Sequence, residues 1–247
     1  MIKAALEYLN KLATPQTYEI NGDTYATVGM SRVAPHIDRP DEIKFHSLDS
    51  ITQAIKTEID REEIPKPLFV SVNRHDLVEV FTTYRTDNMK RDSLYEARPE
   101  LPDHFPTWSE HDDAIIMLRS RFIQNAGTEY LLELLSRVSN EDTVSSEDNG
   151  VTQKVTATKG IAMKQIYDVN GRVTLAPFRT FLEVAQPESE FILRVKQGDK
   201  EKDVPMKIGI IEADGGAWKL KAKHNIADYF RESLKDLISE NLVVVAE

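Results

Sequence analysis

Three lysines alternate with other residues in the segment WKLKAK, at Lys219, Lys221 and Lys223. If this segment is a β-strand, its period of two places the lysines on one face and Trp218 and Leu220 on the other. A stripe of ammonium groups on one face is suited to binding a phosphate or a carboxylate. The commoner alternative is the solvent-exposed face of an edge strand, where lysines also discourage aggregation.

Arg179 and Arg194 form a second candidate site for an anion. The alternation around Arg179 predicts one strand from Val173 to Val184, and Arg194 lies on the following predicted strand. If Arg179, Glu183 and Arg194 share one face of the sheet, they form a charged cluster in which a guanidinium fork binds an anion. The commoner alternative is a cross-strand ion pair that contributes little to stability.

A pair of glycines in the segment EADGGAWK precedes the lysines and raises the question of a phosphate-binding loop. A nucleotide P-loop has the pattern G-x-x-x-x-G-K-[ST], with a helix beginning directly at the lysine. Here the glycines are adjacent, and no Ser or Thr follows a Gly-Lys pair. We therefore predict a hairpin turn at residues 214–216 between strands 206–212 and 217–222, followed by a helix capped by Asn225.

No recognisable catalytic motif is present in the sequence. Its six histidines include no H-E-x-x-H pair, and no G-x-S-x-G element marks a serine nucleophile. Cysteine is absent, which excludes disulfides, thiolate zinc sites, iron–sulfur clusters and a cysteine nucleophile. We therefore assign no catalytic residues, no metal site and no cofactor, and we favour a protein that is not an enzyme.

Charge and hydropathy limit the partners of the chain. Its 247 residues carry a formal net charge of −10, and an acidic surface repels phosphate backbones, so binding to duplex DNA is disfavoured. The longest apolar runs, AIIML and LVVVA, are far shorter than the ~20 residues of a membrane span. The N-terminal segment lacks the apolar core of an export signal. We expect a cytoplasmic protein without membrane association.

Hydrophobic periodicity predicts an α+β fold, with a mixed helix and hairpin half at the N-terminus and a C-terminal antiparallel sheet closed by an amphipathic helix. Ser47 is the predicted N-cap of the second helix. The predicted helices lie at residues 2–13, 48–59, 109–124, 130–138 and 226–238. The predicted strands flank a turn at Asn21-Gly22 and lie at residues 68–72, 77–84, 151–158, 173–184, 191–196, 206–212, 217–222 and 242–246.

Two segments are predicted to be irregular. Residues 85–107 contain three prolines and no sustained periodicity. Residues 139–150, with the sequence SNEDTVSSEDNG, hold four acids and no base, which is typical of a loop or boundary. This segment marks the predicted boundary between a mixed α+β region at 1–140 and a β-rich region with a C-terminal helix at 150–247. One continuous domain is the alternative.

Several segments in order resemble the YfdQ-like proteins of phages and prophages, over roughly residues 40 to 225. They are FHSLDSITQAI, LFVSV with LVEVFTTY, FPTW, the two helices that follow it, LAPFRTFLEV and IIEADGGAWK. The function of that family is unknown, so the resemblance carries over no catalytic residues. It implies a product of early phage genes, encoded near recombination and nucleotide-metabolism functions, in the cytoplasm of a host bacterium.

Three functions are compatible with these observations. The first is a phage-encoded, non-catalytic protein that binds a host protein or a small nucleotide-like anion stoichiometrically, with counter-defence as one role. The second is a metal-dependent phosphodiesterase or nucleotide hydrolase, and the third is an accessory protein of single-stranded-DNA metabolism. Edge strands and a terminal helix are compatible with a homo-oligomer. The predicted anion-binding residues are Lys219, Lys221, Lys223, Arg179 and Arg194.

Overall fold

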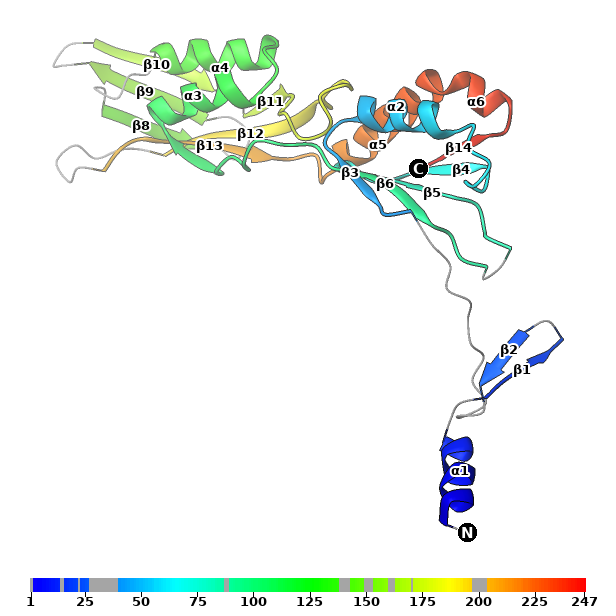
Figure 1. Cartoon of the computed structure of the whole chain (residues 1–247). Helices are drawn as coiled ribbons and strands as arrows, with labels where there is room; N and C mark the ends of the chain where they lie inside the picture. The colour runs from blue at the N-terminus through cyan, green and yellow to red at the C-terminus, as the bar shows by residue number, and fades with distance from the viewer. Residues whose placement is uncertain are drawn as a thin grey trace. The chain divides into compact units, whose positions relative to one another are not determined.

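A computed structural model describes most of the chain, and it shows the predicted α+β fold. The chain divides into two units, Met1–Pro40 and Asp41–Glu247, which are described separately below (Figure 1). The described residues are 2–13, 16–21, 23–26, 40–86, 89–137, 143–148, 153–159, 163–169, 171–196 and 204–247.

The N-terminal unit contains one helix and one hairpin. Helix α1 spans Ile2–Ala13, and strands β1 (Thr17–Ile20) and β2 (Asp23–Ala26) pair in antiparallel fashion. Asn21 has a φ of 54°, the left-handed conformation that a two-residue type I′ turn requires. The hairpin prediction is confirmed, although Gly22 itself lies outside the described residues.

A mixed five-stranded sheet forms the first half of the larger unit. Its order is β14-β4-β5-β6-β3, with antiparallel pairs at the centre and a parallel strand at each edge. The predicted pair of strands around residues 68–84 and the predicted strand at 242–246 are confirmed. The strands are β3 (Ile43–Phe45), β4 (Leu68–Arg74), β5 (Leu77–Phe81), β6 (Ser93–Ala97) and β14 (Val243–Ala246).

Strand β6 lies inside residues 85–107, which we expected to be irregular, so that prediction is wrong at this point. Leu94 and Tyr95 are adjacent in β6 and both are buried. The strand therefore lacks the strict alternation that identifies a half-buried strand in a sequence. The register between β5 and β6 also shifts between Val80 and Phe81, which is a local irregularity in the pairing.

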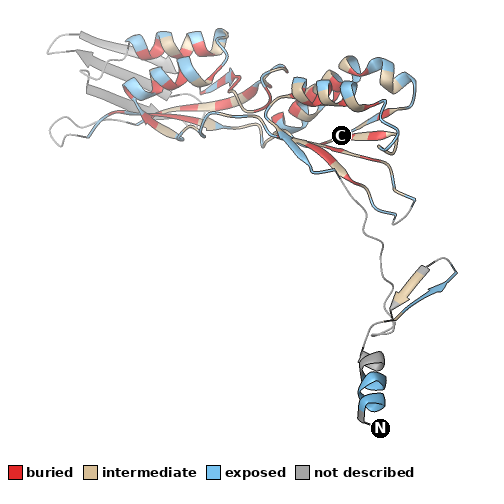
Figure 2. Cartoon of the chain, in the orientation of Figure 1, coloured by how far each residue is buried: buried red, intermediate tan, exposed pale blue. Residues whose placement is uncertain are grey.

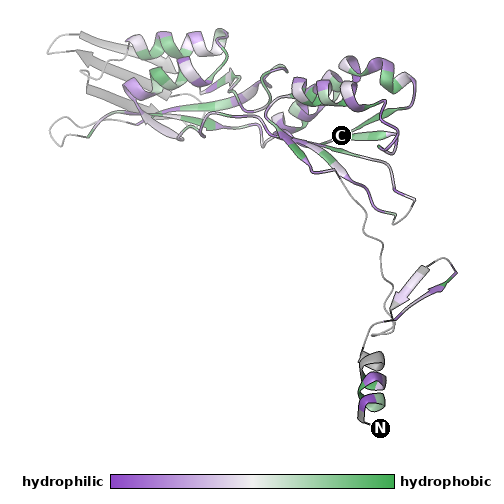
Figure 3. Cartoon of the chain, viewed as in Figure 1, coloured by the Kyte–Doolittle hydropathy of each residue, from purple (hydrophilic) through white to green (hydrophobic). Residues whose placement is uncertain are grey.

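Three helices cover one face of this sheet, and buried, hydrophobic residues line the contact (Figures 2 and 3). They are α2 (Leu48–Glu58), α5 (Trp218–Ser233) and α6 (Lys235–Ser239). The hydroxyl of Ser47 accepts a hydrogen bond from the Ser50 amide at 3.2 Å, which confirms the predicted cap of α2. The first core includes Ile51, Ile55, Val70, Val80, Ile226 and Phe230, all essentially inaccessible to solvent.

A four-stranded antiparallel sheet forms the second half of the larger unit, in the order β11-β12-β13-β7. Helices α3 (His111–Arg121) and α4 (Ala126–Arg137) pack on it. Its strands are β7 (Trp108–Glu110), β11 (Arg172–Leu175), β12 (Ser189–Lys196) and β13 (Lys207–Glu212). The second core includes Leu118, Phe122, Leu131, Leu175, Phe191 and Leu193.

A separate antiparallel sheet has the order β10-β9-β8. Strand β8 spans Thr143–Asp148, β9 spans Gln153–Lys159 and β10 spans Met163–Val169. The prediction of a loop at 139–150 is wrong for residues 143–148, because this polar segment finds its hydrogen-bond partners in β9. The remaining residues of that segment lie outside the described part of the chain.

Both cores draw on residues from both sides of the predicted boundary at 140–150. Strand β7, from the first region, pairs with β13 from the second, and β14, from the second region, pairs with β4 from the first. Phe181 and Val184 lie between β11 and β12 in the chain, yet they are buried in the first core. Residues 41–247 form one compact unit by their contacts.

Two strand predictions around the candidate site are wrong. Strand β11 ends at Leu175, so the segment from residue 176 to residue 188, predicted to complete a strand to Val184, is a loop with one isolated bridge, Phe122 to Pro177. The second error is the strand at 217–222, because α5 begins at Trp218 and no hairpin forms at residues 214–216. Asn225 lies within α5 rather than at its cap, and its side-chain amide donates to the Ala185 carbonyl at 2.9 Å.

Candidate ligand-binding cavity

The helical start of α5 changes the geometry of the predicted lysine stripe. At about 3.6 residues per turn, Lys219 and Lys223 lie one turn apart on the same side of the helix, whereas Lys221 lies on another side. The three ammonium groups therefore do not share one face, as the strand prediction required. Lys219 alone among them lines the cavity described below.

The predicted cluster of Arg179, Glu183 and Arg194 on one sheet face is also not formed. Arg179 and Glu183 lie in the loop that precedes β12, and only Arg194 lies in a strand. A side-chain oxygen of Glu183 accepts from the Leu48 amide at 2.7 Å, at the start of α2. Arg194 donates to the Leu193 carbonyl at 2.9 Å. Arg179 takes other partners and lines the cavity.

A cavity of about 480 Å³ lies where the two halves of the larger unit meet. The segments that border it are residues 101–107, the loop around Arg179, strand β13 and the first turn of α5. This volume is within the range of small-molecule sites. Much of its wall is apolar and consists of Leu101, Pro102, Phe105, Phe178, Ile210 and Ile211.

Phe105 lines the cavity and packs against aromatic residues of the second core. Its ring centroid lies 5.0 Å from that of Phe122 and 6.3 Å from that of Phe191, two buried core residues. The ring of His104 stacks on Phe105, with 5.3 Å between centroids and 19° between planes. The aromatic wall is therefore held by packing of the kind that stabilises cores.

Arg179 is the central polar residue of the cavity, with a side chain only 12% exposed. Its guanidinium donates from Nη1 to Glu212 and from Nη2 to the Pro187 carbonyl, at 3.0 Å, and to the Ser189 hydroxyl. Its Nε has no hydrogen-bond partner among the described residues. Burial lowers the pKa of Arg179, and the charge of Glu212 opposes this effect. An arginine stays charged despite such a shift.

Trp218 stacks against this guanidinium. The Arg179 Cζ atom lies 3.9 Å from the centroid of the Trp218 ring, a cation–π contact. Trp218 is 8% exposed, and its buried indole N–H donates to none of the described residues. His75 meets the indole edge-on, with 4.6 Å between centroids and 76° between planes. The guanidinium, the indole and the imidazole thus form one contiguous group, in which the guanidinium lies over the indole and the imidazole meets it edge-on.

His75 is brought to this group by the turn between β4 and β5. Its carbonyl accepts from the Thr180 hydroxyl at 2.5 Å, which joins the turn to the Arg179 loop. Burial lowers the pKa of His75 below its usual value, and the neighbouring charge of Lys219 adds to the shift, while Asp76 opposes it. Burial therefore favours the neutral form of the imidazole.

Asp214 accepts hydrogen bonds from backbone amides at the start of the helix that carries Trp218. Its carboxylate accepts from the Gly216 amide at 2.9 Å, the Trp218 amide at 3.3 Å and the Ser189 hydroxyl at 2.7 Å. Burial alone would raise the pKa of Asp214, but these hydrogen bonds and the charge of Arg179 lower it. Gly215 and Gly216 have φ values of 64° and 83°, which other residues rarely adopt. The anion at this helix start is thus the protein's own carboxylate.

Charged side chains around the cavity nearly balance. The cations are Arg121, Arg179 and Lys219, and the carboxylates are Asp103 and Glu212, which leaves one positive charge in excess. Arg121 donates to the Asp103 carbonyl, and the Lys219 Nζ atom lies 5.7 Å from the Trp218 ring centroid. Within a chain of net charge −10, this is a locally favourable place for a small anion.

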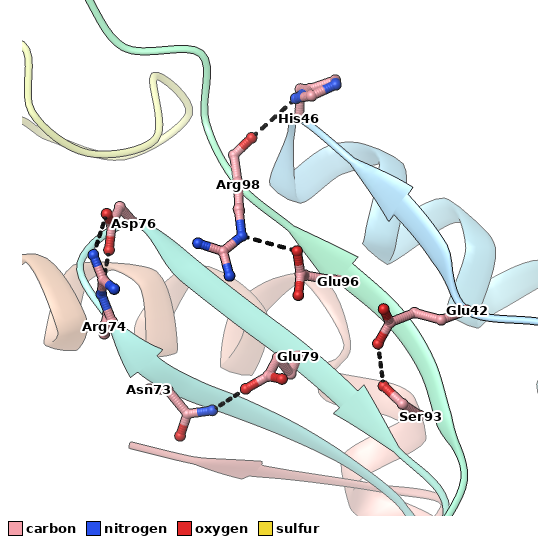
Figure 4. A network of polar contacts seen from close by, with 9 residues as sticks. All are labelled: Glu42, His46, Asn73, Arg74, Asp76, Glu79, Ser93, Glu96 and Arg98. Atoms are coloured by element: carbon pink, nitrogen blue, oxygen red, sulfur yellow. Dashed lines mark hydrogen bonds and ion pairs between the residues drawn. The ribbon is translucent and has the colours of Figure 1, made fainter.

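A second polar network lies on the five-stranded sheet (Figure 4). Arg74 forms two hydrogen bonds with Asp76, at 2.9 and 2.7 Å, and Arg98 donates to Glu96 at 2.8 Å. Asn73 donates to Glu79 in the same network. Within the described part of the chain, no group of three or more His, Asp or Glu residues is placed to hold a metal ion.

Comparisons of the chain with protein-family models, with curated proteins and with solved structures return no match. None of the helices in the described ranges is both long and apolar enough to cross a membrane.

The sequence indicated only part of this cavity. It identified Arg179 and Lys219, but it assigned Trp218 to the face opposite the lysines and gave no role to His75 or Glu212. One signal of the true geometry is present in the sequence. Trp218, Ala222 and Ile226 recur at intervals of four, which is a helical pattern, and all three are buried.

Proposed function

We propose that this chain is a non-catalytic protein that binds one small anionic ligand in the cavity beside Arg179. The observation that carries this proposal is the stack of Arg179 on Trp218, because a buried guanidinium held rigidly at a cavity wall is preorganised to bind an anion. The ammonium group of Lys219 adds a second cation at the same cavity.

The ordered segments that resemble YfdQ-like phage proteins support a biological setting for this activity. In that setting, a phage product captures a small signal molecule in the cytoplasm of its host, and counter-defence is the role we favour. A nucleotide-like anion is one candidate ligand. Capture of a host protein would use another surface and would not depend on the cavity.

Native mass spectrometry of protein purified from bacteria tests this proposal. We expect the wild-type chain to release one small anion per chain on denaturation. Lys219→Glu should lose most of that ligand, because it places a negative charge at the cavity. Lys221→Glu is the matched control, since Lys221 is exposed on another side of the same helix. Equal loading of the two variants would show that the cavity is not the binding site.

The two alternative functions predict different measurements. A metal-dependent phosphodiesterase or nucleotide hydrolase would show turnover that EDTA stops. A single-stranded-DNA accessory protein would bind oligonucleotides with an affinity that falls steeply as salt is added. The helical placement of the three lysines removes the flat basic stripe that motivated the DNA hypothesis.

A further inference from the structure

Strand β14 forms one edge of the five-stranded sheet and carries no charged side chain. Its sequence, VVVA, spans Val243–Ala246, and it pairs with β4 in a register without a bulge. Among the strands that the structure describes, β14 pairs with β4 alone. The other side of β14 therefore presents backbone N–H and C=O groups to which a further strand can bind.

The other edges of the two larger sheets each contain a charge. Lys44 lies in β3, Glu110 lies in β7 and Arg172 lies in β11. A charged side chain on an edge strand is a common way in which proteins prevent that edge from pairing with another chain. Strand β14 lacks such a charge, and its Val244 is 40% exposed. Of these four edges, β14 is therefore the one best suited to pairing.

Helix α5 leaves one of its sides open next to this edge. It contacts both β14 and β4, and on its side toward α2 the hydroxyl of Tyr229 donates to Asp49. On the other side, His224 and Arg231 form ion pairs with Glu247, which directly follows β14, at 2.9 and 3.2 Å. The free edge of β14 and an exposed stripe of α5 thus face the same direction.

A second copy of the chain can pair with this edge and with this helix at once. Two identical strands that pair in antiparallel fashion are related by a twofold axis perpendicular to the sheet, so the helices of both copies lie on one face. Neighbouring strands are about 4.8 Å apart, which places two helices that each lie over β14 and β4 about 10 Å from one another. Packed helices have interaxial distances of about 8–10 Å.

The charges on the open side of α5 are complementary to themselves under this symmetry. Asp228 and Arg231 form an ion pair at 2.8 Å within one chain, and both side chains are exposed. The twofold axis makes the two α5 helices antiparallel, so Asp228 of each copy can lie beside Arg231 of the other. A partner with charge of only one sign would meet repulsion from one of these residues. The mixed charge therefore favours a second copy as the occupant.

We infer that the chain forms a homodimer in which two β14 strands pair in antiparallel fashion and join the five-stranded sheets of both copies into one. The interface consists of the β14 edge and the stripe of α5 that contains Asp228 and Arg231. No residue of β14 lines the cavity beside Arg179, so this inference goes beyond the proposed binding function and does not depend on it.

Analytical ultracentrifugation of the full chain tests the inference. We expect the wild-type chain to be dimeric, and Val244→Lys should raise the dissociation constant of the dimer at least about tenfold, because it places a charge on the edge. Ile43→Lys is the matched control, since Ile43 is an exposed apolar residue of the opposite edge strand, and this variant should stay dimeric. A monomeric wild-type chain would overturn the inference. A dimer that Val244→Lys leaves intact but Leu6→Lys dissociates would assign the contact to α1 and overturn it as well.

Cross-linking tests which strands pair, without adding a charge. The chain contains no cysteine, so a single introduced cysteine reports on one position. In an antiparallel pair about a twofold axis, one residue lies opposite its own copy, at a distance that a disulfide can bridge. Mild oxidation should therefore give a covalent dimer in Val244→Cys or Val245→Cys, and Ile43→Cys should stay monomeric on a denaturing gel. A covalent dimer in neither β14 variant would overturn the inference.

Discussion

Two arginine–carboxylate networks in this molecule use the same chemistry in different surroundings. The pair Arg74–Asp76 lies at an exposed turn, and the arginine side chain is 57% exposed. The pair Arg179–Glu212 lies at the cavity, where the arginine side chain is 12% exposed. Exposed ion pairs contribute little to stability, whereas breaking a buried one leaves an uncompensated group. Burial of the arginine, rather than pairing with a carboxylate, therefore distinguishes the two networks.

The two networks also differ in the acceptors to which each arginine donates. Arg74 presents two nitrogens to one carboxylate in the bidentate arrangement typical of a local ion pair. Arg179 distributes its bonds over Glu212, Pro187 and Ser189, and still retains an Nε without a partner among the described residues. The following predictions test this contrast, from the largest expected effect to the smallest.

Arg179→Ala should lower the free energy of unfolding by about 2–3 kcal/mol, because it removes a mostly buried side chain, its bonds to Pro187 and Ser189 and the stacking partner of Trp218. Urea denaturation followed by circular dichroism measures the change. Lys221→Ala, on the exposed part of α5, is the control and should be close to wild type. A loss no larger than that of the control would remove the distinction between the two networks.

Asp214→Asn should cost about 1–2 kcal/mol at neutral pH, because it weakens the bonds from the Gly216 and Trp218 amides and from the Ser189 hydroxyl. The pKa of Asp214 is lowered in the folded protein, so its contribution is fully present above the ordinary carboxyl range. It is lost as the pH falls through the lowered folded value. Denaturation at pH 7 and in strong acid should show the difference between the variants shrinking. A constant difference would contradict this assignment.

His75 should also make the stability of the folded protein depend on pH, with an effect smaller than that of Asp214. Because its pKa is lowered on folding, the unfolded chain binds the proton more readily. Stability is therefore highest above the usual value of 6.5 and falls as the pH drops from there toward the lowered folded pKa. Thermal melts between neutral and mildly acidic pH should show this decrease, and His75→Gln should reduce it. An equally steep decrease in the variant would exclude His75 as its source.

Arg74→Ala should change the free energy of unfolding by less than about 1 kcal/mol, because the Arg74 side chain is 57% exposed and water screens its pair with Asp76. The same urea titration measures it, and added salt should reduce the difference from wild type further. A change as large as that of Arg179→Ala would show that exposure does not separate the two networks.

Local signals in the sequence were sufficient for several elements of the fold. Asn21 and the glycine after it identified a hairpin, Ser47 identified a helix cap, and the alternation around Val70 and Val80 identified paired strands. Each of these features depends on residues within one turn or one strand. Their chemistry is therefore readable without knowledge of the tertiary contacts.

The start of α5 could not be resolved locally, because its segment carries two periods at once. Lys219 and Lys221 alternate as in a strand, whereas Trp218, Ala222 and Ile226 recur as in a helix. Contacts with β4 and β14, together with the hydrogen bond from the Trp218 amide to Asp214, decide in favour of the helix. Tertiary packing often overrides such local preferences.

The sequence identified individual residues of the candidate site but not the contacts between them. Arg179 was identified by its residue type, but its partners Trp218 and His75 come from a distant helix and a distant turn. The strand predicted around Arg179 was wrong because Phe181 and Val184, which alternate poorly as a pair, turn toward another core. The spacing of residues in a single sequence does not show that these distant segments contact one another.

The position of Phe181 has a consequence for how the protein unfolds. In the chain it lies in the loop that connects β11 and β12 of the four-stranded sheet, yet its ring is fully buried in the core of the five-stranded sheet. The core of the five-stranded sheet therefore cannot lose its packing without releasing the loop that joins β11 to β12. Heating should therefore melt residues 41–247 in one cooperative transition, and a ligand bound between the cores should raise the melting temperature of both together.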